Sequence, residues 1–272
     1  MQIYQSIILG IVQGLTELLP ISSSAHLFLI PWILKWNIPE SFDVALHFGT
    51  LLAIGIFFFK DWLGLIKGGF NLAIKKEKTV EGRMFWYIVL ATIPGGIIGF
   101  ILDHFAEEIL IKPVVIAIAL IVMGIILYLV DKNCSSKTDY EDLSLKQTFL
   151  IGLSQSLAFI PGVSRSGVTM TTGRLLGGKR EAVAKYSFML SAPIVLAATV
   201  FKLGDFIEYF KTATTEGIVA FVFGVLISFV VGIFVIKFLL EYLRKGSFKV
   251  FAIYRVVIGL GVLIYILLPY FG

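Results

Sequence analysis

The sequence is poor in cysteine and in charge, and both shortages limit what the protein can be. Its single cysteine, Cys134, excludes an intramolecular disulfide, and the three histidines form no zinc-type cluster with it. Charged residues make up 15% of the 272 residues, whereas soluble domains have about 25%. Residues 1–10 lack the basic segment of a secretory signal peptide, so we expect no cleaved leader. These shortages argue against a disulfide scaffold, a zinc protein and an ordinary soluble domain.

Hydrophobic residues are abundant instead. They make up 58% of the chain, and apolar runs of about 16–20 residues recur along it, close to the length that spans a bilayer. This pattern predicts an all-α polytopic membrane protein. The net charge of +5 is better explained by basic loops on one side of a membrane than by nucleic acid, which we do not expect as a partner.

A polar stretch interrupts the apolar sequence near the N-terminus. Residues 10–26 read GIVQGLTELLPISSSAH, and their polar members include Gln13, Glu17, Ser22, Ser23, Ser24 and His26. Gln13 and Glu17 are four residues apart, so a helix would place them on one face. Pro20 should end that helix. The serines should then cap a second helix whose first backbone N–H groups stay free.

The chain repeats this stretch 142 residues later, where residues 152–166 read GLSQSLAFIPGVSRS. Gln13 is matched by Gln155, Ser22 by Ser164, and Ser24 by Ser166. The copies differ at two positions that matter chemically: Phe159 stands where the first copy has Glu17, and Arg165 where it has Ser23. We therefore predict an internal duplication within one membrane domain (1–272), with a first repeat at 1–134 and a second at 135–272.

The hydrophobic pattern predicts six transmembrane helices and two re-entrant helical hairpins. The hairpins are expected at residues 3–34 and 145–176. The spans are expected at Phe42–Phe59, Met84–Leu102, Pro113–Val130, Ala182–Phe201, Gly217–Ile236 and Val250–Leu268. Each repeat then contains three spans, an odd number, so the second repeat is inverted relative to the first.

The basic residues predict the orientation. Most Lys and Arg residues fall in the segments 60–83, 132–146, 179–185 and 237–249, which should face the cytoplasm. The first of these, 60–83, is expected to be a long loop. The acidic residues Asp103, Glu107 and Glu108 then fall on the outer side. The first hairpin enters from outside and the second from the cytoplasm. Inverted repeats with broken helices place a binding site near the membrane midplane, so both polar stretches should meet in one cavity.

The residues expected at this meeting point suit a phosphate-bearing ligand. Two helix N-termini would aim N–H donors at an anion, and Arg165 would add a charged fork for phosphate oxygens. Glu17 is too costly at that depth without a partner, which Arg165 or a bound cation could supply; Gln13 would offer the same cation a neutral oxygen. His26 is a candidate general acid or base, and Ser23 or Ser24 a candidate nucleophile.

Structural interpretations stand beside these. The serines could act only as helix caps, and His26 could be structural. Arg174 could extend toward the cytoplasm, and Arg255 could pair with a carboxylate. His47 could face the cavity or only pack.

Two motif blocks resemble one known family. QGLTELLPISSSAH and PGVSRSGVT, which ends at Thr169, resemble the two signature blocks of the undecaprenyl-diphosphate phosphatases of the bacitracin-resistance type. The resemblance covers the whole chain. It implies an integral enzyme of the bacterial plasma membrane that hydrolyses a polyprenyl diphosphate to the monophosphate, recycling the lipid carrier for cell-wall synthesis. It also implies a divalent cation (Mg or Ca) and an active site open to the outer side.

The resemblance also implies residue roles. Glu17 is the essential carboxylate and a metal ligand, with Gln13 beside it; Ser23 is the nucleophile or a phosphate ligand; His26 carries a proton and Arg165 clamps the diphosphate. Substrate contacts are expected from Gln13, Ser22, Ser24, Ser164, Ser166 and Thr169.

A second class of function stays open. A secondary transporter or flippase of a phosphorylated lipid or another anion would also use inverted repeats, helix N-termini and Arg165. The combination of Glu17, Ser23 and His26 favours the enzyme, because transport needs no nucleophile beside a base. The sequence leaves open whether Ser23 or water attacks, and whether the chain works alone or as a homodimer.

Overall fold

The computed structural model describes residues 1–102 and 111–268, and within these ranges the chain is helical apart from turns, loops and an isolated bridge between Thr138 and Gly178. The expected outer residues Asp103, Glu107 and Glu108 lie outside the described ranges. The elements are α1 (Ile3–Thr16), α2 (Ser23–Leu34), α3 (Glu40–Phe57), α4 (Phe59–Lys75), α5 (Val80–Leu102), α7 (Pro113–Asn133), α8 (Leu145–Ser154), the 3₁₀ helix η1 (Gln155–Phe159), α9 (Arg165–Leu175), α10 (Arg180–Phe201), α11 (Leu203–Thr212), α12 (Thr215–Leu243) and α13 (Lys249–Leu267).

The helices confirm a multi-pass membrane protein. By length and composition, five of the described helices could cross a membrane, namely α5, α7, α10, α12 and α13. A sixth span is possible if α3 and α4 count as one, although they meet at a 78° bend. Large apolar side chains cover the outer surface of the bundle, for example Ile118 on α7, Phe234 on α12 and Val257 on α13. A lipid environment explains that exposure.

Segment 60–83 is not the loop that its charges suggested. Most of it is α4, a 17-residue helix that begins after the bend at Phe58. One face of α4 packs on α5 and buries Leu65, Gly68 and Gly69, while lysines occupy other positions. The prediction was wrong because a few lysines on an amphipathic helix resemble a solvated loop when only charge is counted. The short helix α11 follows α10 in the same way and was also missed.

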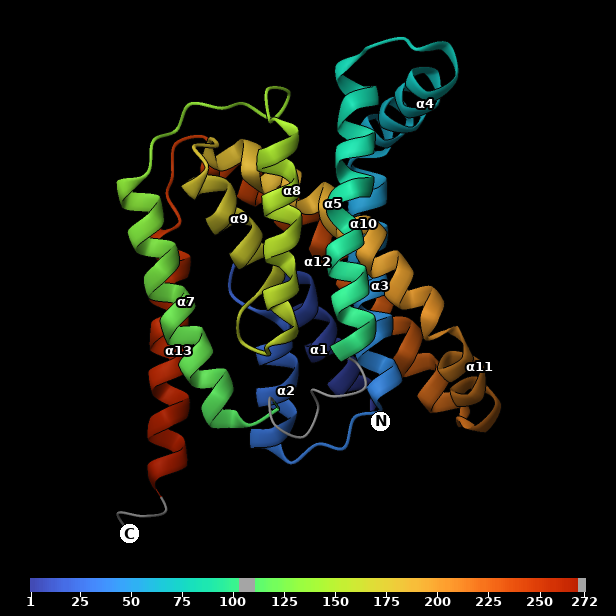
Figure 1. The fold of residues 1–272 in the computed structure, drawn as a ribbon. Helices are drawn as coiled ribbons and strands as arrows, with labels where there is room; N and C mark the ends of the chain where they lie inside the picture. The colour runs from blue at the N-terminus through green and yellow to red at the C-terminus, as the bar shows by residue number, and fades with distance from the viewer. Residues whose placement is uncertain (103–110, 269–272) are drawn as a thin grey trace.

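Two broken helix pairs approach the middle of the bundle from opposite ends. In Figure 1 both outer ends of the pair α1–α2 lie at the bottom, and both outer ends of the pair α8–α9 lie at the top. The first break comprises residues 17–22, and the second residues 160–164. Both breaks therefore lie inside the bundle rather than at its surface, as the polar stretches predicted.

Helices from different halves of the chain pack against each other. α1 lies against α12 and α8 against α5, while α7 pairs with α13 and α3 with α10. Glycines permit the close approach of the first two pairs. A Cβ atom at Gly10 would lie 2.8 Å from the carbonyl oxygen of Gly224, and one at Gly152 would overlap the backbone of Ala91.

The basic loops lie together. Figure 1 shows the loops that join α4 to α5, α7 to α8 and α12 to α13 at the same end of the bundle, opposite both chain termini. This arrangement agrees with the side that the Lys and Arg distribution predicts to be cytoplasmic.

Candidate active site

Glu17 is the centre of a cluster of polar side chains between the two breaks. It follows the last residue of α1, and its side chain is 6% exposed. Its Oε1 accepts a hydrogen bond of 2.6 Å from Nη2 of Arg165, which opens α9. Its Oε2 accepts one of 2.5 Å from the Ser23 hydroxyl and one of 3.3 Å from the Gln13 amide. The predicted meeting of the two polar stretches is therefore present in the structure.

His47 of α3 also contacts Glu17. Its Nε2 lies 3.3 Å from Glu17 Oε2, and its Nδ1 lies 2.7 Å from the backbone oxygen of Asp43. Both ring nitrogens face oxygen acceptors, an arrangement that suits the imidazolium form opposite the carboxylate. From the sequence, His47 could either face the cavity or only pack in the core. The signal that could have placed it is the spacing of Asp43 and His47, which lie one helical turn apart in the N-terminal half of a largely apolar helix.

The two breaks share an unusual backbone conformation. Ser22 and Ser164, the N-cap residues of α2 and α9, have φ angles of 76° and 72°. Non-glycine residues seldom occupy this region, and such strain concentrates at functional sites. Each serine hydroxyl caps its helix, at 3.4 Å from Ala25 N and 3.0 Å from Gly167 N. The strained turn thus directs both helix N-termini toward the same space.

The space between the helix N-termini is a pocket of about 280 Å³. Its polar lining consists of Glu17, Ser23, Ser24, His47, Gln155, Ser164, Arg165 and Thr199, and apolar residues such as Phe159 complete it. Within the described residues, the backbone N–H groups of Ser23, Ser24 and Arg165 have no hydrogen-bond acceptor. Free N–H groups, a guanidinium and an imidazole on an apolar wall form a site for an anion.

Several residues expected to touch the substrate lie beside this pocket rather than in its lining. Gln13 contacts Glu17 but is not part of the pocket lining. The Ser22 hydroxyl is a helix cap, as described above. The Ser166 hydroxyl donates to the backbone oxygen of Leu19 at 2.9 Å, and the Thr169 hydroxyl lies 2.7 Å from that of Ser187. Ser24 and Ser164 do line it.

His26 faces away from the Glu17 cluster. Its Nδ1 lies 2.7 Å from the backbone oxygen of Ser22, and its Nε2 lies 2.8 Å from the hydroxyl of Tyr254 on α13. In this arrangement the ring ties the turn before α2 to α13. A role in proton transfer stays a prediction from the family resemblance.

Arg255 binds the two breaks together. This side chain of α13 is fully buried and donates to the backbone oxygens of Pro20 at 3.1 Å, Gly162 at 2.8 Å and Val163 at 2.9 Å. Its Nε lies 3.4 Å from the backbone oxygen of Leu120. The carboxylate partner considered from the sequence is not found among the described residues. Backbone carbonyl groups, which every break leaves without helical partners, take its place.

Arg174 points toward the basic end of the bundle, the side expected to be cytoplasmic, where it contacts the loop that joins α7 to α8. It is 1% exposed, and its Nε lies 3.0 Å from Asp131 Oδ1. The same carboxylate accepts from Arg180 at 2.7 Å and from the backbone of Phe248 at 3.0 Å. This cluster joins the ends of α7 and α9 to the starts of α10 and α13.

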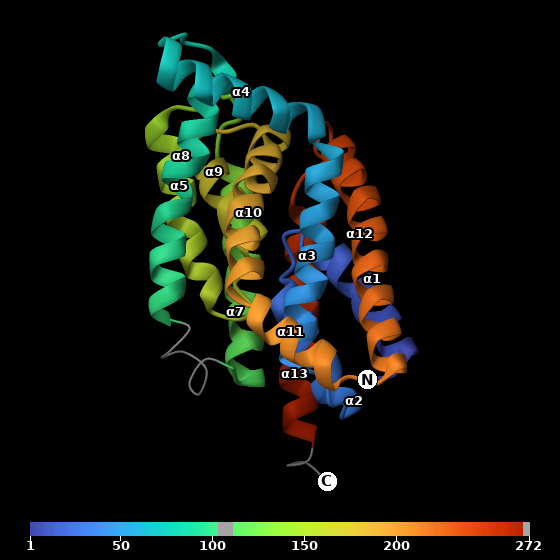
Figure 2. The same ribbon diagram turned by 90° about the vertical axis from the view of Figure 1, so that its right-hand side faces the viewer.

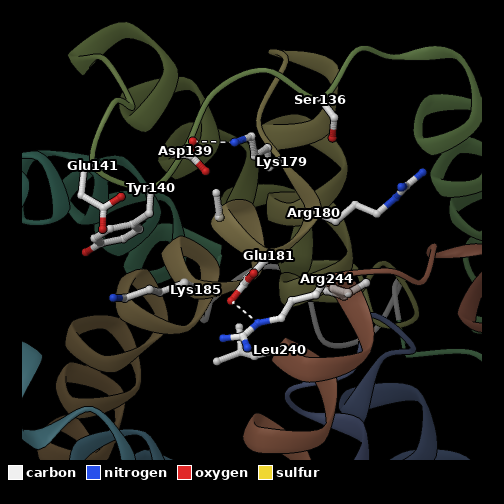
Figure 3. Close-up of a pocket in the computed structure, with 12 residues that line it drawn as sticks. Ser136, Asp139, Tyr140, Glu141, Lys179, Arg180, Glu181, Lys185, Leu240 and Arg244 are labelled. Atoms are coloured by element: carbon white, nitrogen blue, oxygen red, sulfur yellow. Dashed lines mark hydrogen bonds and ion pairs between the residues drawn. The ribbon is translucent and has the colours of Figure 1, made fainter.

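A larger cavity, of about 510 Å³, lies at the basic end of the bundle (Figure 3). Its cations are already paired: Lys179 with Asp139 at 2.6 Å and Arg244 with Glu181 at 3.1 Å. Burial, followed by the nearby carboxylates Asp61 and Glu141, raises the pKa of Tyr140 in its wall, so this phenol stays neutral. With its charges compensated, this cavity is a poorer anion site than the smaller one.

The predicted cation can be compared with the side chains present. The described residues contain no group of three or more His, Cys, Asp or Glu side chains arranged for a metal ion. However, the amide oxygen of Gln13 is buried and without a hydrogen-bond partner in the described part of the chain. An orphaned oxygen one turn from a carboxylate fits a hard divalent cation whose other ligands come from phosphate and water.

The fold and the site define an integral membrane protein with a polar cluster, chemically suited to an anion, between two broken helix pairs. The chain belongs to the family described as Bacitracin resistance protein BacA, whose model matches residues 6–261. It is 48% identical over 275 residues to the undecaprenyl-diphosphatase of Pelotomaculum thermopropionicum, with 100% of both chains covered. Its identity to the undecaprenyl-diphosphatase of Caldicellulosiruptor bescii is 45%, covering 98% of this chain and 99% of the relative. The corresponding protein of Gemmatimonas aurantiaca is 47% identical over 96% of both chains.

Proposed function

We propose that this protein hydrolyses undecaprenyl diphosphate to the monophosphate and inorganic phosphate, and so recycles the lipid carrier for cell-wall synthesis. The observation that carries the proposal is the 2.5 Å hydrogen bond from the Ser23 hydroxyl to Glu17, beside Arg165 and two helix N-termini. A transporter needs an anion site but no hydroxyl held against a carboxylate. The relatives named above support the same activity.

The residues suggest a sequence of steps. The diphosphate binds between the N-termini of α2 and α9, where Arg165 has N–H groups beyond the one given to Glu17. Glu17 accepts the Ser23 proton as the hydroxyl oxygen attacks the terminal phosphorus. The bond from that phosphorus to the bridging oxygen breaks, and undecaprenyl phosphate leaves with its electron pair. Glu17 gives the Ser23 proton to the departing phosphate oxygen and then accepts a proton from water, whose oxygen attacks the phosphoserine phosphorus. The bond from that phosphorus to the Ser23 oxygen breaks, Glu17 returns the proton to the Ser23 oxygen, and inorganic phosphate leaves.

A divalent cation, Mg²⁺ or Ca²⁺, is part of the proposal. The amide oxygen of Gln13 and the carboxylate of Glu17 would hold it together with the diphosphate oxygens. When bound, it would neutralise charge that develops on the phosphoryl oxygens. Arg165 and the free N–H groups of Ser23 and Ser24 bind the remaining oxygens and orient the phosphorus toward the Ser23 hydroxyl.

The membrane arrangement that we propose is an inverted repeat of three spans each, with α1–α2 and α8–α9 as re-entrant hairpins in the bacterial plasma membrane. Three features support it. The two helix pairs enter the bundle from opposite ends, their second helices have matching serine caps, and helices of the first half pack against helices of the second, as α1 does against α12. If the basic loops are cytoplasmic, the α1–α2 pair enters from outside, which supports an active site serving the outer leaflet.

Phosphate release from undecaprenyl diphosphate by the purified protein in detergent tests this function. We expect release that a chelator stops and that added Mg²⁺ or Ca²⁺ restores. Ser23 should become phosphorylated during turnover, detectable by mass spectrometry after rapid acid quenching. If the wild-type protein releases phosphate without a detectable phosphoserine, and the Ser23→Ala variant keeps its activity, the attacking nucleophile is water. Absence of release from folded protein would favour the transporter.

A further inference from the structure

A second cavity adjoins the polar pocket and differs from it in chemistry. It has a volume of about 370 Å³, and its lining is apolar apart from Lys202 at the end of α10. Four residues line both cavities, namely Val44, Phe159, Ile194 and Ala198. The two cavities therefore share a wall, and a ligand with one polar and one apolar end could occupy both.

α5 forms one wall of this apolar groove with glycines instead of side chains. Gly95, Gly96 and Gly99 follow Pro94, and all three line the groove. A Cβ atom at Gly99 would overlap the ring of Phe159, whereas one at Gly96 would have no atom within 4 Å. Gly99 is thus required for packing, but the space beside Gly96 is the open groove itself.

The groove runs between helices that enclose the active site. Figure 2 shows α10 flanked by α5 and α3, and these helices supply nearly the whole lining. Gly96, Ala197 and Ala198 are all exposed, so small side chains leave the groove accessible from the outer surface of the bundle. A flexible hydrocarbon chain could pass from the pocket along this surface toward lipid.

We propose that this groove binds the first isoprene units of the polyprenyl chain while the diphosphate occupies the polar pocket, and that the missing side chain of Gly96 keeps it open. The proposal rests on the proposed function and adds a specificity-determining position to it. Continuity with the anion site and an apolar lining support this occupant.

Phe159 marks the border between the two cavities. It occupies the position that corresponds to Glu17 in the other half of the duplication. One copy of the broken helix pair thus provides the carboxylate for the phosphate end, and the other provides an apolar wall for the chain end.

The test is the variant Gly96→Leu, whose Cβ position has no atom within 4 Å and whose side chain would occupy the groove. Gly261→Leu is the matched control, because Gly261 is also an exposed helix glycine with no atom within 4 Å of its Cβ position. We expect Gly96→Leu to lower kcat/KM for undecaprenyl diphosphate about tenfold relative to this control. Hydrolysis of isopentenyl diphosphate, whose single isoprene unit is too short to follow the groove, should change less than about twofold.

Two results would overturn the groove assignment. Equal losses for the long and short substrates would mean that Gly96→Leu disturbs the phosphate site or the fold. No loss for undecaprenyl diphosphate would mean that the chain takes another path.

A binding measurement separates the groove from the hydrolytic function. A photoreactive prenyl diphosphate should label residues 95–99 and 194–198 of the wild-type protein, and Gly96→Leu should reduce that labelling. Labelling confined to other helices would refute the groove even if the protein is active. Labelling of the groove by a protein that releases no phosphate would retain the groove and refute the phosphatase.

Discussion

The two breaks have the same backbone plan but different chemistry. Each places a serine with positive φ before a helix N-terminus, and each has a second serine two residues later. The first break supplies Glu17 and Ser23, which would react. At the equivalent positions the second supplies Phe159 and Arg165, which would bind. A duplicated scaffold can thus provide two helix N-termini that point toward one anion. One copy then carries the reacting side chains and the other the binding side chains.

The largest difference is expected between Glu17 and its counterpart Phe159. Glu17→Ala removes the acceptor for Ser23 and leaves Arg165 without its carboxylate, so we expect a loss of roughly 10³-fold in phosphate release. Phe159→Ala should reduce release of phosphate from undecaprenyl diphosphate only about tenfold. Both variants are compared at equal protein concentration, with thermal unfolding as the control for folding. Similar losses in the two would refute the division of roles.

The next pair, Ser23 and Arg165, separates reaction from binding kinetically. Ser23→Ala should lower kcat by roughly 10²–10³-fold with little change in KM, since it removes the attacking oxygen. Arg165→Lys keeps the charge but loses the planar fork, so we expect KM to rise about tenfold as well as a fall in kcat. Initial rates over a range of substrate in mixed micelles give both constants. A pure kcat effect of Arg165→Lys would remove the clamp role.

The two histidines should also differ. His47→Ala removes a ring that contacts Glu17, and we expect kcat to fall about 10–100-fold. His26→Ala should cause a smaller loss through the displaced Ser22 turn, and Tyr254→Phe, which removes the ring's other partner, should reproduce part of it. If His26→Ala is the more damaging variant and Tyr254→Phe is neutral, the proton-carrier role implied by the family resemblance is supported instead.

Arg255 should affect stability more than any surface cation. Arg255→Met leaves the backbone carbonyl groups of Pro20, Gly162 and Val163 in the interior without a donor, so we expect the free energy of unfolding to fall by about 3 kcal/mol. Arg244→Met, at an ion pair whose arginine is 64% exposed, is the control and should have almost no effect. Thermal unfolding in detergent compares the two. Equal stability of both variants would contradict the role of Arg255 in joining the breaks.

The smallest effects are expected for the paired serines that follow the caps. Ser24→Ala removes a pocket hydroxyl and should raise KM about threefold, with unchanged stability. Ser166→Ala removes the bond to the Leu19 carbonyl and should lower stability by about 1 kcal/mol, with little change in KM. Kinetics and thermal unfolding of both variants separate the two roles. The reverse pattern would exchange binding and structural functions between the copies.

Sequence patterns were sufficient for the features that depend on local chemistry. The helix breaks follow from proline and serine, and the meeting of Glu17 with Arg165 follows from the duplication and the basic loops. Five of the six expected spans follow from apolar runs, whereas the one expected at Phe42–Phe59 qualifies only together with α4. Features that depend on distant partners were not accessible. Tyr254 turns the His26 ring away from Glu17, although 228 residues separate the two. The carbonyl partners of Arg255 become visible only in the folded structure. Every residue has the same backbone oxygen, so the sequence does not indicate which carbonyl groups will meet the guanidinium.

The link made by Arg255 has a mechanical consequence. Its guanidinium binds Pro20 in one half of the chain and Gly162 and Val163 in the other, and the hydroxyl of Ser166 reaches Leu19 across the same boundary. A rocking motion that exposes the site alternately to each side of a membrane must separate the halves here and break these bonds. These bonds therefore oppose such a motion and hold the two breaks together at the centre of the molecule.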